Sequence, residues 1–265
     1  MQNTSRYPSD LTDAEWARLE PLVPKPKTGG RPILYPRRAI LNGVRYLLRS
    51  GCAWRLLPHE FPPWATTYHD FRCWTKSGVW QQMHDRLRTA CRHHYDKEAA
   101  PTAAILDSQT VKLGEQGGPC GYDAGKKING RKRHVLVDTL GLLLGVVVTA
   151  ARVQDRDGAK TLWAVVLRGR RRLQVIWADG GYGGQWEAWV KQQRPFGKLH
   201  LEIVRRAATT VGFAVLPKRW IVERTFAWLY KCRRLARDYE RQPAHSEAMI
   251  RIAMIGLMVR RLACD

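Results

Sequence analysis

The sequence has no apolar run that approaches the roughly 20 residues needed to cross a bilayer as a helix. The longest run, residues 140–151, is rich in valine and interrupted by Gly141 and Gly145, so it predicts a β-strand instead. The N-terminal residues Met-Gln-Asn-Thr-Ser-Arg-Tyr-Pro also lack the apolar core of a secretory signal. These absences argue against a membrane or secreted protein and predict a cytoplasmic one.

Cysteine is scarce and irregularly spaced. The six cysteines include no Cys-x-x-Cys pair, and a disulfide framework is not expected in a reducing compartment. Cys91 lies close to His93 and His94 in the sequence, but a zinc site needs four ligands, and we find no further partners for it. We therefore expect neither a disulfide scaffold nor a zinc site at Cys91.

Acidic residues are few compared with basic ones. The 265 residues include 45 Lys+Arg and 23 Asp+Glu, which gives a formal net charge of +22 and a pI near 10.3. Such an excess favours a polyanionic partner, and nucleic acid is the leading candidate. An anionic membrane is the alternative, but it would favour a basic amphipathic terminal helix. The first thirty residues are instead mixed in charge and carry four prolines.

Residues 1–98 are predicted to form a helical domain. Residues 12–15, Thr-Asp-Ala-Glu, have the spacing of a helix capping box. A second helix is expected between Pro36, which suits a first helical turn, and Gly51, which suits a C-terminal stop. The succession of a helix, a short helix and an aromatic helix suits a helix-turn-helix-like module that binds DNA.

Tyr68, Phe71 and Trp74 lie at helical spacing in the aromatic segment. At this spacing aromatic residues are more often core than base contacts, by roughly four to one as a prior, so a plain helical bundle is the alternative interpretation. The side chains expected to contact DNA, if this helix does so, are Thr67, His69, Arg72 and Lys76.

Residues 99–265 show a different pattern, in which strands and helices alternate. The expected strands are 103–111, 134–138, 142–150, 173–178 and 201–204, the expected helices are 157–168, 185–193, 217–235 and 246–262, and residues 114–125 are expected to be a glycine-rich loop. Three strands in a meander, a helix, a further strand and a late helix predict an α/β domain with a ribonuclease-H-like mixed sheet and flanking helices.

Three acidic residues lie where this fold would gather carboxylates. Asp107 and Asp179 each end an apolar run, and Glu223 lies in the late helix. Converging carboxylates hold divalent metal ions, and two ions about 3.5–4 Å apart activate an attacking oxygen and stabilise a leaving oxygen. Each acid also has a structural alternative. The two aspartates suit strand-end turns, and Glu223 suits an ion pair with Arg219 or Lys231.

Other acids are interpreted as structural. Asp138 is expected in a hairpin turn, and Asp155 and Asp157 are expected to cap the start of a helix.

Several segments resemble bacterial insertion-sequence DDE transposases, specifically those of the insertion sequence five family. The segments that carry the resemblance are Ile-Leu-Asp107-Ser-Gln-Thr-Val, Gly-Arg-Lys-Arg-His134-Val-Leu-Val-Asp, Trp-Ala-Asp179-Gly-Gly-Tyr182, Arg219-Trp-Ile-Val-Glu223-Arg-Thr-Phe-Ala-Trp-Leu, Arg-Arg-Leu-Ala-Arg-Asp-Tyr-Glu240, Gly51-Cys-Ala-Trp-Arg-Leu-Leu-Pro and Phe61-Pro-Pro-Trp-Ala-Thr-Thr-Tyr. The resemblance extends over nearly the whole chain, from about residue 11 to residue 262.

The resemblance implies a DNA transposase. In such enzymes Asp107, Asp179 and Glu223 would bind two Mg²⁺ ions, with Mn²⁺ as a substitute. Water would attack the phosphodiester at the end of the element, and the freed 3′-hydroxyl would then attack target DNA. The implied partners are double-stranded DNA, as terminal inverted repeats and as target, and a second copy of the chain assembled on DNA. The implied location is the bacterial cytoplasm, at the nucleoid.

Related transposases carry a Tyr–Arg–Glu–Lys pattern around the glutamate, which holds DNA near the cut. Arg219 matches the arginine, but Leu216 and Tyr230 stand where tyrosine and lysine would be. Lys231 lies one position further, about 100° around a helix of 3.6 residues per turn. Arg219 is the one auxiliary residue carried over from this pattern.

Basic clusters elsewhere are further candidates for DNA contact. They are residues 126–127, 131–133, 168–172 and 231–234. Arg131, Lys132 and Arg133 are the first choice for DNA contact, because they border the predicted hairpin beside Asp107, and we also assign DNA contact to Lys231. A solvated surface is the alternative for each cluster.

Three functions remain open at this point. The first is a transposase that cuts and joins DNA, the second is a metal nuclease of the same fold that only hydrolyses DNA, and the third is a DNA-binding relic without catalysis. The first two use the same acids, so joining of a 3′-hydroxyl end to target DNA separates them.

Overall fold

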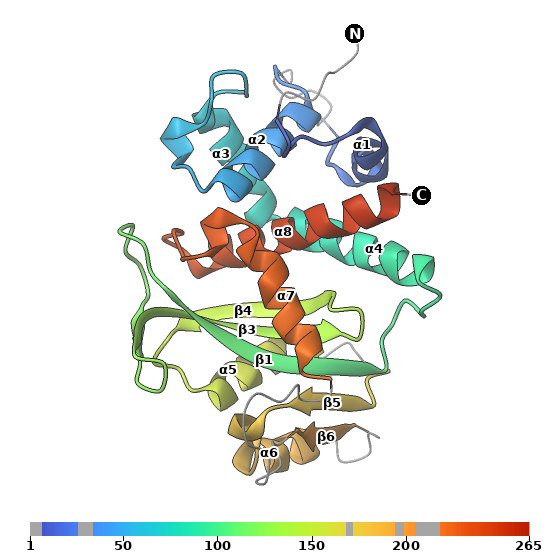
Figure 1. Ribbon diagram of the computed structural model, residues 1–265, viewed down its shortest axis with the longest axis vertical. Helices are drawn as coiled ribbons and strands as arrows, with labels where there is room; N and C mark the ends of the chain where they lie inside the picture. The colour runs from blue at the N-terminus through green and yellow to red at the C-terminus, as the bar shows by residue number, and fades with distance from the viewer. Residues whose placement is uncertain (1–6, 26–33, 168–171, 194–198, 205–217, 265) are drawn as a thin grey trace. The chain divides into compact units, whose positions relative to one another are not determined.

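The computed structural model describes residues 7–25, 34–167, 172–193, 199–204 and 218–264 (Figure 1). The chain forms two compact units. The first comprises residues 1–95, 229–236 and 244–265, and the second comprises residues 96–228 and 237–243. The domains expected at 1–98 and 99–265 stay a prediction. The compact units separate after Tyr95, and the first one also takes in two later segments.

The first unit is helical. It contains α1 (Asp13–Leu19), α2 (Arg37–Ser50), α3 (Trp64–Lys76), α4 (Val79–His94) and, from residue 244 onward, α8 (Pro243–Ala263), with short 3₁₀ turns at Glu20–Leu22, Trp54–Leu56 and Arg233–Leu235. No helix in the described part of the chain is long and apolar enough to pass through a membrane. All six cysteines lie in the described residues and are free thiols.

Local sequence signals set the ends of these helices. The capping box at α1 is confirmed, because the Glu15 backbone N–H donates to Thr12 Oγ1 at 3.1 Å and the Thr12 N–H donates to Glu15 Oε2 at 3.3 Å. The predicted stop of α2 is also confirmed. Gly51 follows the helix with a φ of 78°, a left-handed conformation that costs glycine little.

The aromatic residues of α3 are mainly core residues. Phe71 and Trp74 are buried, and both rings pack against the buried Trp80, with centroid distances of 6.3 and 5.0 Å. The expectation that Thr67 is available to DNA is wrong, because its side chain is buried and donates to the Pro62 carbonyl.

The second unit is a mixed sheet with helices. Its strands are β1 (Ala103–Lys112), β2 (Gly121–Asp123), β3 (Ile128–Asp138), β4 (Leu143–Ala150), β5 (Val175–Ala178) and β6 (His200–Ile203), and its helices are α5 (Asp155–Leu162), α6 (Gln185–Gln193) and, as far as residue 228, α7 (Trp220–Tyr230). A five-residue π-helical turn, Trp163–Leu167, continues α5, and a 3₁₀ turn spans Gly180–Tyr182.

The strand order is β2-β3-β1-β5-β6, and β4 pairs with β3. The pairs β1–β3, β3–β4 and β2–β3 are antiparallel, whereas β1–β5 and β5–β6 are parallel. Three antiparallel strands followed by parallel ones, with helices flanking the sheet, are the α/β arrangement predicted for a ribonuclease-H-like domain (Figure 1).

The structure departs from the predicted elements in a few places. β2 lies within the expected loop 114–125, and β3 begins at Ile128 rather than at residue 134. The expected helix 217–235 is shorter in the described chain, where α7 spans Trp220–Tyr230, and Pro217 lies outside the described residues.

The apolar core of the second unit covers one face of the sheet. It includes Ala104 and Leu106 of β1, which pack with residues of α5 and α6 such as Leu162 and Trp186. Because successive side chains of a strand point to opposite faces, Asp107 points away from this core. The sheet therefore presents Asp107 on the face opposite α5.

Candidate active site

Asp107 lies midway along β1, and Asp179 directly follows β5, the parallel strand beside it. The register of β1 and β5 pairs Ile105 with Trp177, and each aspartate lies two residues further along its own strand direction. A separation of two residues also keeps both side chains on the same face. The parallel pairing of β1 and β5 therefore brings the two aspartates close together.

Arg219 links the two carboxylates. Its Nη2 atom lies 3.4 Å from Asp107 Oδ2 and 3.8 Å from Asp179 Oδ2, so one guanidinium group contacts both acids. Arg219 lies immediately before α7, the helix that carries Glu223. The arginine carried over from the resemblance thus reaches both aspartates.

The second oxygen of each aspartate is held by backbone. Asp107 Oδ1 accepts a hydrogen bond from the Ser108 N–H at 2.7 Å, and Asp179 Oδ1 accepts one from the Gly181 N–H at 2.9 Å. Asp179 therefore fills the turn role considered as its structural alternative. Its other oxygen still faces Arg219, so the two roles are compatible.

Burial raises the pKa of Asp107 to about 6. The Ser108 N–H and the Arg219 guanidinium act against this rise, and the negative charge of Asp179 adds to it. The neighbouring Tyr182 is also buried. Burial first, and then the charges of Asp155, Asp107 and Asp179, raise the pKa of its phenol well above the usual value, so Tyr182 stays neutral. The site is thus a partly desolvated, acidic environment.

Glu223 is placed differently from the two aspartates. It is exposed in the first turn of α7, and its N–H donates to the Arg219 carbonyl at 3.3 Å. The helix is fixed to the β3–β4 turn, where Thr225 Oγ1 donates to the Gly141 carbonyl at 2.8 Å. Within the described residues no three acids, histidines or cysteines form a group that could hold a metal ion. The structure therefore joins two of the three predicted acids through Arg219.

The pair of aspartates suits a hard divalent cation. Both Oδ2 atoms already lie within 4 Å of one positively charged nitrogen. Carboxylate oxygens are also the donors that Mg²⁺ and Mn²⁺ prefer. Asp107 and Asp179 would hold such an ion, and a third carboxylate would have to come from Glu223.

Arg131 and Arg133 are 0% and 1% exposed, which contradicts their predicted contact with DNA. Arg131 donates to the carbonyls of Pro119, Glu240 and Arg241 and pairs with Asp238 at 3.3 Å. Arg133 donates to Gln109 and to the Arg237 carbonyl. Both guanidinium groups bind protein groups in place of phosphate.

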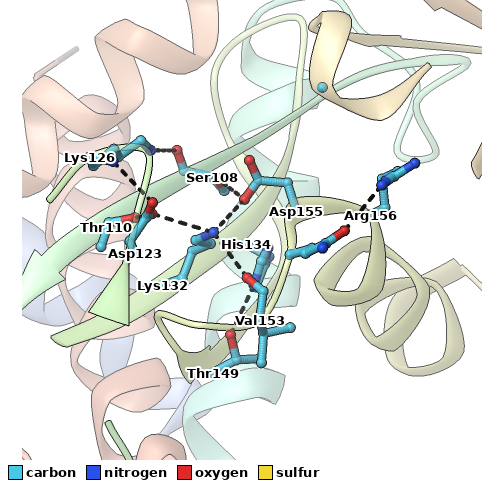
Figure 2. A network of polar contacts seen from close by, with 12 residues as sticks. Ser108, Thr110, Asp123, Lys126, Lys132, His134, Thr149, Val153, Asp155 and Arg156 are labelled. Carbon is cyan, nitrogen blue, oxygen red and sulfur yellow. Dashed lines mark hydrogen bonds and ion pairs between the residues drawn. The ribbon is translucent and has the colours of Figure 1, made fainter. Parts of the chain in front are cut away.

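Lys132 is 6% exposed, which also contradicts its predicted contact with DNA. It lies in a polar network instead (Figure 2). Its Nζ atom lies 3.0 Å from Asp155 Oδ1, 3.4 Å from Asp123 Oδ2 and 3.0 Å from the Val153 carbonyl oxygen. The three donors of the ammonium group are therefore matched by three protein acceptors.

Other predicted DNA-contacting residues are exposed. Arg72, Lys76 and Lys231 are solvent-accessible, and the Arg72 guanidinium lies 5.9 Å from the centre of the Tyr68 ring. The exposed Lys126 and Lys127 lie at the β2–β3 turn. Residues 168–171 of another predicted cluster lie outside the described part of the chain.

The acids interpreted as structural divide into two cases. Asp138 is a turn residue as predicted, since its Oδ1 accepts from the N–H groups of Leu140 and Leu142 at 2.9 Å. The interpretation of Asp155 as a cap is wrong. Its carboxylate makes no capping bond and instead accepts from Ser108 Oγ at 2.8 Å (Figure 2). Nothing local in the sequence marks this contact, because Ser108 and Asp155 are 47 residues apart.

The fold and site together define a class of nucleic-acid-processing domain with one acid in a central strand, one directly after the adjacent parallel strand and one on a late helix. The family model described as Transposase DDE domain matches residues 98–258, and the model described as Putative transposase of IS4/5 family matches residues 11–84. The chain therefore belongs to the transposase DDE domain family, and the predicted resemblance to insertion-sequence transposases is confirmed. Divalent metal use is general in this family.

Two curated relatives come from Burkholderia cepacia. The protein named "Insertion element IS402 uncharacterized 16.2 kDa protein" is 31% identical over 107 residues, which cover 36% of this chain and 71% of the relative. The "Putative transposase for insertion sequence element IS402" is 31% identical over 121 residues, which cover 43% of this chain and 55% of the relative. The chain thus spans little more than half the length of the second relative.

Proposed function

We propose that this protein is a DNA transposase that cleaves the ends of an insertion sequence and transfers the freed 3′-hydroxyl end into target DNA. The observation that carries the proposal is the meeting of Asp107 and Asp179 at Arg219, on two adjacent parallel strands, in a chain of the transposase DDE family. The net charge of +22 supports double-stranded DNA as the partner, both as terminal inverted repeats and as target.

The catalytic residues of this proposal are Asp107, Asp179 and Glu223, which would hold two Mg²⁺ ions or, as substitutes, two Mn²⁺ ions. Bound metal would supply charge stabilisation and an activated oxygen at the phosphodiester. The Ser108 N–H fixes Asp107 and the Gly181 N–H fixes Asp179, so one oxygen of each carboxylate is oriented before metal arrives. Glu223 completes the set if α7 brings it toward the aspartates.

Arg219 would balance the two aspartates in the free protein and hold a DNA phosphate near the cut once metal takes over that balance. Its guanidinium already lies within 4 Å of both carboxylates. A planar guanidinium with several N–H donors suits either a carboxylate or a phosphate group.

The side chains proposed to contact DNA are Arg219, Arg72, Lys76 and Lys231, with Lys126 and Lys127 as further exposed candidates. Arg131, Lys132 and Arg133 are not among them, because they are buried and bonded to protein groups. A second copy of the chain, assembled on DNA at the bacterial nucleoid, belongs to the same proposal, since strand transfer joins two ends.

The test is cleavage and joining by the purified full chain. Duplex DNA copied from the sequences that flank the coding region would be incubated with Mg²⁺, and cut and joined products would be resolved. We expect both products from the parent, and neither from Asp107→Asn or Asp179→Asn, which keep side-chain size but lose the charge.

Asp157→Asn is the matched control, because Asp157 is exposed and its side chain pairs with Lys160 on the same helix. It should retain both products. Cleavage without joining would support a nuclease instead, and cleavage by Asp107→Asn near the parent rate would contradict the site assignment.

A further inference from the structure

Ser108 is held on several sides by groups that the proposed reaction does not use. Its N–H donates to Asp107 Oδ1. Its Oγ donates to Asp155 Oδ1 at 2.8 Å, and its carbonyl accepts from Lys126 Nζ at 3.4 Å (Figure 2). Ser108 thus connects Asp155, on one face of the sheet, to the carboxylate of Asp107 on the other. Its placement decides where one N–H donor of the candidate active site lies.

Asp155 is itself anchored by a buried charge. Its Oδ1 lies 3.0 Å from Lys132 Nζ, and Lys132 also contacts Asp123 Oδ2 at 3.4 Å. A buried ammonium group is costly unless carboxylates and other acceptors surround it. Thr110 adds a second tie, because its Oγ1 donates to Asp123 Oδ2 at 2.6 Å. The network therefore holds β1 at two residues that point to the same face of the sheet, Ser108 and Thr110.

The strand geometry explains how such ties reach Asp107. In β1, Ser108 and Thr110 point to the face of α5, and Asp107 points to the opposite face. Ser108 pairs with His134 and Thr110 with Lys132 across β1 and β3, so the network spans two neighbouring strands. Fixing Ser108 on the α5 face fixes the backbone that presents Asp107 on the other face.

We propose that Asp155 is a positioning residue for Asp107, acting through Ser108 and anchored by Lys132. This inference rests on the proposed function, since it assigns Asp155 a part in preparing the same site. Asp157, on the same turn of α5, lacks this arrangement. It is exposed, and its carboxylate pairs with Lys160 at 3.3 Å.

The experiment measures Mn²⁺ binding to the full chain by isothermal titration calorimetry without DNA, alongside thermal unfolding and DNA cleavage. The variants are Asp155→Ala, Ser108→Ala and the double variant, with Asp157→Ala as the matched control. Ser108→Ala removes the link to Asp155 but keeps the N–H that binds Asp107. It therefore tests the connection even if Asp155→Ala fails to fold.

We expect Asp155→Ala and Ser108→Ala each to weaken Mn²⁺ binding by about 10-fold, the lower end of what outer-layer ligand partners contribute to metal sites. The double variant should be no weaker than the worse single variant, because both changes break one connection. Asp155→Asn keeps an oxygen that accepts from Ser108, so its loss should be smaller. Asp157→Ala should bind Mn²⁺ within twofold of the parent, roughly the scatter expected for a distant independent site.

Three results would overturn the positioning role. Asp155→Ala binding Mn²⁺ as the parent does would show that Asp155 has no influence on the site. Multiplying losses in the double variant would show that Asp155 and Ser108 act independently. Fewer bound Mn²⁺ ions, at unchanged affinity, would make Asp155 a ligand instead.

Failure of the proposed function has a different signature. In that case the parent and Asp157→Ala would show no Mn²⁺ binding and no cleavage, and both proposals would fall together. If the parent cleaves DNA, Asp107→Asn does not, and Asp155→Ala matches the parent, only the positioning role fails.

Discussion

The charged side chain of Asp107 is unfavourable for folding because it is buried, yet the proposed reaction needs its charge. The carboxyl group is buried at the end of an apolar run, and burial raises its pKa from 3.8 to about 6. In a neutral solution the group is nevertheless ionised, close to Asp179 and with Arg219 as a compensating cation. A buried acid retained under these conditions is typical of functional sites, where charge is kept at some cost in stability.

Asp107→Asn should therefore stabilise the protein at pH 8. The folded state binds the Asp107 proton more tightly than the unfolded state, so the contribution of this group to stability falls as the pH rises from about 4 to about 6. Asparagine has no such loss, and its advantage should reach up to ~3 kcal/mol above pH 6 and shrink towards zero near pH 4. Urea unfolding of both proteins across this range measures it. A less stable variant at pH 8 would mean that the Arg219 contact outweighs burial.

At the scale of elements, α7 depends on the turn between β3 and β4 for its position. Gly141 has a φ of 78°, and a Cβ atom there would lie 2.9 Å from Thr225 Oγ1 and 2.9 Å from the Trp228 ring. Both neighbours belong to α7, the helix that follows Arg219 and contains Glu223. A change at this turn therefore acts on the site through the placement of a helix.

Gly141→Ala should displace α7 and lower cleavage as well as stability. Gly184 is the matched control, because its φ is 73° and a Cβ atom there meets nothing within 4 Å. Gly184→Ala should cost only the left-handed backbone strain, about 1 kcal/mol. Gly141→Ala should cost about 2 kcal/mol more, from overpacking against α7. Equal unfolding free energies for the two variants would show that the turn does not fix the helix.

Elements with strong local signals were predictable from the sequence. Residues 103–111 and 185–193 correspond closely to β1 and α6. An apolar run marks the strand, and Gly183 and Gly184 precede the helix. β2 was not predicted, since its three residues, Gly-Tyr-Asp, show no apolar pattern and form a strand only by pairing with the start of β3. The adjacency of Asp107 and Asp179 could be expected from the two apolar runs that they end in the sequence, whereas the contact of Asp155 with Ser108 required the folded sheet.

At the scale of the whole molecule, the chain alternates between its two units. It leaves the second unit after residue 228, returns for residues 237–243 and leaves again. The returning segment supplies the acceptors for Arg131, which are the carbonyls of Glu240 and Arg241, 109 and 110 residues away in sequence. Because local patterns carry no trace of such distant partners, a cluster of three basic residues looked like a DNA-binding surface.

From the large positive charge we expect DNA affinity to depend on salt, and this dependence should differ between exposed and buried basic residues. Each phosphate neutralised by a basic side chain contributes about 0.9 to the slope of log affinity against log salt. Lys231 is exposed, so Lys231→Gln should lower this slope by about 0.9 and leave the free energy of unfolding unchanged.

Arg131→Met is the contrasting variant. Because Arg131 is buried and paired with Asp238, it should leave the slope unchanged and lower the free energy of unfolding by several kcal/mol. Binding to the flanking-sequence duplex, measured across salt concentrations by fluorescence anisotropy, checks both. A reduced slope for Arg131→Met with unchanged stability would return that residue to the DNA-binding surface.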